Sequence, residues 1–200
     1  MAWYYSFEAK EIQRFIMQSD KLRDMVGGSE LVNRLCGDFL RDSLKAIGVS
    51  KPEQAIIASA AGWARIQFDH KDQAENFHKI WPLMTSRFAP GIQIIQTLHE
   101  MTGTLPESMD KGFEALRGAR NLNRVELPEI GPWVERSQRT GGAAVKIEKE
   151  REDKALIDRA TVRKRACAKD HSSLVQKITQ EINRSEERRV GKECRSWGSP

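Results

Sequence analysis

Residues 12–32 constrain the fold more than any other part of this sequence. Apolar side chains recur there at spacings of three and four positions, which predicts a helix with one buried face. The pattern stops at Gly27 and Gly28, and glycine readily adopts backbone angles that other residues avoid. Ser29 follows at a position that suits the N-cap of a second helix. We therefore predict a helix over residues 12–47 that is broken at the two glycines.

The predicted break has two interpretations. Free backbone N–H groups at a glycine turn and at a helix start form an electropositive concavity that suits a phosphate or nucleotide. The alternative is a glycine-broken helix pair whose polar residues are simply solvated, and a Gly-Gly-Ser sequence alone does not distinguish the two. The residues that would line a phosphate site are Ser19, Lys21, Arg23, Gly27, Gly28 and Ser29.

The order of periodic segments over residues 1–100 predicts an α+β domain. Short, β-prone runs predict strands at residues 3–7, 55–59, 63–68 and 92–99, and a second helix is expected over 72–87. The link between the second and third strands is short and contains Gly62, which favours an antiparallel hairpin. Pro82 predicts a kink in the second helix. The resulting order, β-α-β-β-α-β, is the ferredoxin-like arrangement that polymerase palm domains also use.

Residues 101–183 lack a comparable pattern, because glycines and prolines interrupt them up to about residue 150. We expect an irregular linker here, with short helices at 114–120 and 172–182. A charged segment over 151–169 presents basic side chains that could contact RNA phosphates. Such a face is also commonly just solvated. The candidate RNA contacts are Arg159, Arg163, Lys164 and Arg165.

Composition narrows the class of protein further. The sequence contains no run of the roughly 18 apolar residues that a membrane helix needs, and its first residues do not resemble a signal peptide. Cys36, Cys167 and Cys194 are too widely spaced for a zinc or disulfide framework. These features favour a cytoplasmic protein. The net charge of +5 permits an RNA partner without requiring one.

The most specific motif block in the sequence is Tyr5-Ser6-Phe7-Glu8-Ala9, Ile12-Gln13-x-Phe15-Ile16, and Ser19-x-Lys21-Leu22-Arg23-Asp24-x-Val26-Gly27-Gly28-Ser29-x-Leu31. Later motifs are Ala61-Gly62-Trp63-Ala64-Arg65, Trp81-Pro82-Leu83, Arg87-Phe88-Ala89-Pro90-Gly91, and Gly131-Pro132 through Arg139-Thr140-Gly141. Together these motifs resemble the large palm-containing subunit of type III CRISPR effector complexes, within the Cmr-type branch and its relatives with a second palm domain. The resemblance covers roughly residues 1–180.

This resemblance implies RNA-guided antiviral defence, with guide RNA and other effector subunits as partners. Active members make cyclic oligoadenylate from ATP with Mg²⁺, on a palm whose Gly-Gly-Asp-Asp hairpin supplies carboxylates to the metals. The present sequence departs from that pattern. Glu8 alone stands where a first-strand acid would be, and no metal site is predicted. The hairpin residues without an acid are Ala60, Ala61, Gly62 and Trp63.

The last 17 residues, 184–200, have a different character. They resemble the conceptual translation of a sequencing-adapter read-through, so we expect a non-native tail on a fragment whose active palm would lie downstream. The alternative is a genuine basic tail with a free Cys194. The domain organisation expected is therefore a degenerate palm at 1–100, a linker and helical segment at 101–183, and the tail.

Three functions remain open at this point. The chain could be a non-catalytic palm that works by assembly with partner subunits and guide RNA. It could be a palm-superfamily nucleotidyl cyclase that uses ATP, although the missing hairpin acids argue against this. It could also be an RNA-binding module whose sheet stacks bases on exposed aromatic side chains. The candidate stacking residues are Tyr4 and Phe68.

Overall fold

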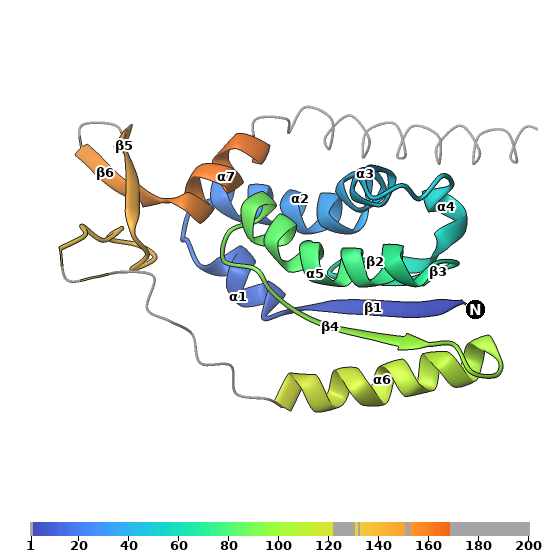
Figure 1. The fold of residues 1–200 in the computed structure, drawn as a ribbon. Coiled ribbons are helices and arrows are strands. Elements are labelled where there is room, and N and C mark those ends of the chain that lie inside the picture. Colours follow the sequence, from blue (N-terminus) through green and yellow to red (C-terminus); the bar gives the residue numbers. More distant parts are fainter. Residues whose placement is uncertain (1, 122–130, 132, 151–152, 169–200) are drawn as a thin grey trace, which may run out of the picture.

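A four-stranded antiparallel sheet organises the chain, in a computed structural model that describes residues 2–121, 131, 133–150 and 153–168 (Figure 1). The strands lie in the order β2-β3-β1-β4. The two central strands pair antiparallel, with Glu8 opposite Trp63, and β2 pairs antiparallel with β3. This topology confirms the predicted α+β class and the hairpin. The strand bounds are Trp3–Lys10 (β1), Ile56–Ala60 (β2), Trp63–Phe68 (β3) and Gln93–Glu100 (β4).

The inner face of the sheet packs against helices to form the core. Alternate residues of β1, Tyr5 and Phe7, are fully buried, and the ring of Phe7 lies 5.1 Å from that of Trp81. Phe77 stacks on Trp81 with centroids 5.0 Å apart. α5 runs through Pro82 without ending there. The first five helices of the chain are α1 (Ile12–Met17), α2 (Leu22–Cys36), α3 (Asp38–Ala46), α4 (Pro52–Ala55) and α5 (Lys71–Phe88).

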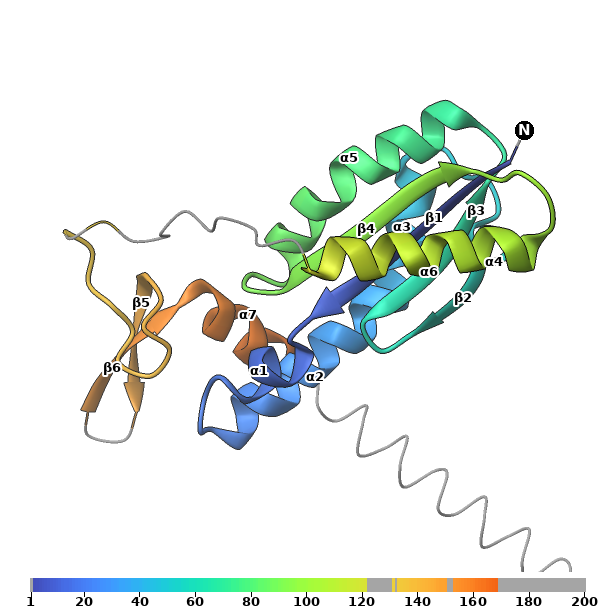
Figure 2. The ribbon, with the colours of Figure 1, turned by 90° about the horizontal axis from the view of Figure 1, so that it is seen from below.

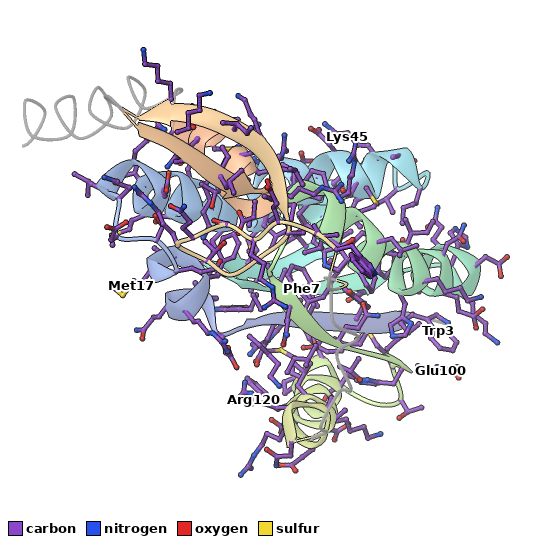
Figure 3. All side chains as sticks on the ribbon, turned by 90° about the vertical axis from the view of Figure 1, so that its left-hand side faces the viewer. Trp3, Phe7, Met17, Lys45, Glu100 and Arg120 are labelled. Carbon is purple, nitrogen blue, oxygen red and sulfur yellow. The ribbon has the colours of Figure 1, made fainter. Side chains whose placement is uncertain are left out.

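The outer face of the sheet is covered by α6, Leu105–Asn121, which lies across β1 and β4 (Figure 2). Figure 3 labels Lys45 of α3 and Arg120 of α6 on opposite sides of β1. The short helix expected at 114–120 is part of this longer helix, so the predicted length was wrong. Pro106 is tolerated because it lies in the first turn, and Gly112 allows close packing, because a Cβ there would lie 2.5 Å from the Tyr4 ring.

A β-hairpin and one further helix follow α6 in the sequence. Strands β5 (Ala144–Glu150) and β6 (Asp153–Asp158) form a two-stranded antiparallel hairpin. β6 leads directly into α7, Arg159–Ala168, which packs beside α2 (Figure 1). The expected helix at 172–182 and the tail at 184–200 lie outside the described residues.

The predicted break at Gly27 and Gly28 was wrong. Both glycines lie inside α2, and Ser29 is an exposed residue in the middle of that helix, not an N-cap. The chain instead interrupts its helices after Met17 and at Gly37, between α2 and α3. Tertiary packing explains Gly27, because a Cβ there would overlap the Lys164 backbone of α7, whereas a Cβ on Gly28 would lie 3.3 Å from the Cα of Ile16 in α1.

Candidate functional site

The end of β1 lies beside the β2–β3 hairpin turn, the corner where the sequence resemblance implies metal-binding acids. Glu8 stands opposite Trp63, and Gly62 makes the turn with a φ of +90°. Ala60, Ala61, Gly62 and Trp63 offer no carboxylate to this corner. In the described part of the chain, no three His, Cys, Asp or Glu side chains gather in a group that could hold a metal.

Glu8 itself is engaged by α6. Its carboxylate accepts a hydrogen bond from Arg120, and its side chain is only 23% exposed. Lys10, two residues further along the same face of β1, donates to the Arg120 carbonyl oxygen at 3.3 Å. The carboxylate of Glu8 is therefore already paired with a guanidinium.

The residues predicted to line a phosphate site are not gathered around a cavity. The backbone of Lys164 covers Gly27, and a Cβ on Gly28 would lie 3.5 Å from the Lys164 side chain. Ser19 is buried and donates to Asp24 at 2.7 Å. Lys21, Arg23 and Ser29 are exposed, and Arg23 pairs with Glu148 at 3.5 Å. Because α2 runs through the glycine pair and α7 packs on Gly27, the helix break that was expected to supply free N–H groups is not formed.

A buried ion pair joins α2 to α7. Arg165 donates to both Asp24 carboxylate oxygens, through Nε at 2.8 Å and a second nitrogen at 3.2 Å. The two side chains are 5% and 0% exposed. Burial by itself raises the pKa of Asp24, but hydrogen bonds from Arg165 and Ser19 and the nearby guanidinium charges bring that pKa below its ordinary value. The bidentate geometry is the strong form of such a pair.

Arg165 also reaches the β5–β6 hairpin. Its remaining terminal nitrogen donates to Glu148, and this hydrogen bond lowers the pKa of the Glu148 carboxyl. One guanidinium therefore connects α2, α7 and β5. This arrangement corrects the prediction that Arg165 contacts RNA, because its donors already serve protein carboxylates.

Lys164 is also withdrawn from solvent, being 1% exposed. Its ammonium donates to the Phe15 carbonyl oxygen and lies 4.2 Å from the centre of the Phe15 ring. Burial lowers the pKa of Lys164. Lys164 and Arg165, two of the four candidate RNA contacts, are therefore buried and do not lie on an exposed basic face.

The start of α7 is capped by Asp158, whose carboxylate accepts a hydrogen bond from the Thr161 N–H at 2.6 Å and so satisfies a free donor in the first turn of the helix.

The other two basic residues of α7, Arg159 and Arg163, lie elsewhere. Both line a pocket of about 430 Å³ with Phe39, Met84, Arg87 and Phe88. Sequence reasoning found the two arginines but not their neighbours, since Phe39 belongs to α3 and the others to α5. A larger cavity of about 530 Å³ lies between the end of α3 and the start of α5.

The base-stacking alternative does not fit this sheet. Tyr4 and Phe68 are each 1% exposed. Tyr4 lies beneath α6, with its ring 5.1 Å from that of His99, and Phe68 belongs to the core on the helical side. Neither ring is available to a nucleobase, because α6 covers one face and the helical layer covers the other.

Sequence reasoning did not identify Asp24 and Glu148 as the residues that hold α7 in place. It also did not identify Arg120 as the partner of Glu8. Their partners lie far along the chain, so no local spacing identifies them. Asp158 is the exception, since an aspartate directly before a helix is a recognisable N-cap signal.

The chain was compared with family models, curated proteins and solved structures. No family model and no curated protein matches the sequence. Among solved structures, the chain is similar to Csm1 of T. onnurineus, a type III CRISPR subunit, with 14% identity and a TM-score of 0.46. The similarity covers 68% of this chain and 23% of Csm1, so the chain spans less than a quarter of that protein. The described helices include none that is long and apolar enough to cross a membrane.

Proposed function

We propose that this chain is a non-catalytic palm of a type III CRISPR large subunit. It would act in RNA-guided antiviral defence through contacts with partner subunits and with nucleotide or RNA. The motif resemblance over residues 1–180 supports the family, and the β2-β3-β1-β4 antiparallel sheet agrees with a palm. The observation that carries the non-catalytic assignment is the pairing of Glu8 with Arg120 beside a hairpin that has no acid.

The chemistry of the donor set explains this assignment. Two-metal phosphoryl transfer needs several carboxylate oxygens to hold the ions near the attacking and leaving oxygens. This corner has one carboxylate, and a guanidinium already neutralises it. The residues present therefore do not fit Mg²⁺, and α7 fills the backbone corner expected to hold ATP phosphates. The palm serves as a scaffold in this proposal.

An activity assay tests the non-catalytic half. The purified chain is incubated with labelled ATP and Mg²⁺ or Mn²⁺, and the products are separated. We expect neither cyclic nor linear oligoadenylate. The Glu8→Ala variant is the matched control, because product that forms with the wild type and disappears in Glu8→Ala would show a live site.

A co-purification experiment tests the assembly half. The chain is co-expressed with the remaining subunits of a type III effector complex and a guide RNA, and the complex is captured through another subunit. We expect this chain to be retained in a fixed ratio to the other subunits. Its absence from an otherwise complete complex would overturn the proposed assembly.

A further inference from the structure

A pocket of about 430 Å³ lies where α3, α5 and α7 meet. Its volume lies within the range of roughly 300–1,000 Å³ that is usual for small-ligand sites. It is separate from the Glu8 corner, which lies at the end of β1 next to the hairpin and α6. The six residues that line it are Phe39, Met84, Arg87, Phe88, Arg159 and Arg163.

Three of the six lining residues carry a guanidinium, and none is acidic. Arg87 and Arg159 are exposed, and neither makes a hydrogen bond or ion pair with another described residue. Arg163 is held in place, because its Nε donates to the Phe88 carbonyl oxygen at 3.1 Å. Like charges around one concavity repel one another, so this arrangement favours an anion between them.

The other three lining residues form an apolar floor. Phe39 stacks on Phe88 with ring centroids 3.9 Å apart and an angle of 14°, and Phe39 also contacts Trp81 of the core at 5.7 Å. Met84 packs against the same core. Phe39 and Met84 are therefore anchored on the core, and they offer partly exposed carbon surface beside the guanidinium groups.

We propose that this pocket binds a nucleotide unit, with the phosphate held by Arg87, Arg159 and Arg163 and the base against the Phe39–Met84 floor. Guanidinium groups suit phosphate because they donate two parallel hydrogen bonds to its oxygens. Bases stack well on aromatic rings and on arginine planes. The inference deepens the proposed function and rests on it in one respect, since it names a site for the nucleotide or RNA contact, while loss of that site would leave the proposed assembly untouched. The unit comes from a free mononucleotide or from a single-stranded RNA.

Binding to the full chain tests the proposal, with AMP and a labelled single-stranded RNA of roughly a dozen nucleotides as probes. The pocket variant is Arg87→Gln/Arg159→Gln. The matched control is Arg14→Gln/Arg117→Gln, which removes the same charge from exposed residues on α1 and α6. We expect at least about a tenfold loss of affinity in the pocket variant and less than about twofold in the control, since a positioned phosphate contact is lost only in the first.

Two further probes test the two halves of the site. An abasic strand of the same length and inorganic phosphate should each bind more weakly than the RNA and AMP, respectively, because both lack a base. Loss of AMP binding in the pocket variant indicates a free nucleotide as the source, and loss of RNA binding alone indicates a strand. The proposal is overturned by equal losses in the two variants, by equal binding of the probes that lack a base, or by no binding at all. Thermal unfolding of each variant, and of Arg159→Gln alone, separates lost binding from lost folding.

Discussion

Gly27 of α2 lies directly against the backbone carbonyl of Lys164 in α7. A Cβ at position 27 would overlap that carbonyl oxygen and lie 2.5 Å from the carbonyl carbon. The glycine therefore allows two helices to approach closely and does not form a turn. This contact is one part of an attachment that also uses the Asp24–Arg165 pair and the Lys164 ammonium on Phe15.

Gly27→Ala is expected to destabilise the protein by about 1–3 kcal/mol or more, because the clash is with backbone that cannot rotate away. The control is Gly118→Ala in α6, where no atom lies within 4 Å of the added Cβ. That exposed helical position should gain about 0.5–1 kcal/mol. Denaturant titration of both variants measures the free energies of unfolding, and equal effects at the two sites would contradict the packing explanation.

Asp24→Asn is expected to cost about 3–5 kcal/mol, because it removes the buried carboxylate of this pair and leaves the Arg165 guanidinium with the partly exposed Glu148 as its carboxylate partner. Asp20→Asn is the matched control, since Asp20 is 77% exposed and pairs with Arg139 at the surface. Its effect should stay within about 1 kcal/mol. Chemical unfolding gives both values, and a similar small loss for the two variants would show that the buried pair contributes little.

The same pair predicts how stability depends on pH. The pKa of Asp24 is lower in the folded state than its ordinary value, which is about 3.9 for an unfolded chain. The unfolded state thus binds more protons between the two values, so the stabilisation is present above about pH 4 and is lost as pH falls through the folded pKa. Wild type should therefore lose more stability than Asp24→Asn on acidification, in unfolding titrations at a series of pH values. Parallel curves would contradict this.

The central sheet and its helices could be predicted because their periodic patterns are local. The predicted bounds of β2, β4 and α5 differ from the observed ones by one residue at each end. α6 was only partly found, because Pro106 and Gly112 suggest irregular structure unless their positions in the first turn and under Tyr4 are known.

The candidate site was harder to predict because its contacts join residues that are far apart in the sequence. Asp24 and Arg165 are 141 positions apart in the sequence, so nothing near either residue shows that it is buried and paired. The sequence of α7 does not show which of its basic side chains face solvent, as Arg159 does, and which lie in the interior, as Lys164 does. Only the packing of α7 on α2 distinguishes them.

Arg120→Ala tests whether the Glu8 corner is unable to bind metal by itself or is only blocked by Arg120. The variant removes the partner of Glu8, and Arg117→Ala, from an exposed pair on the same helix, is its control. The stability loss should stay below about 1 kcal/mol in each case, because both pairs are at least partly exposed to solvent. A carboxylate without further oxygen ligands still binds Mg²⁺ or Mn²⁺ poorly. We therefore expect no rise in melting temperature with either ion in wild type or in either variant. A metal-dependent rise that appears only in Arg120→Ala would show that Glu8 belongs to a functional metal site.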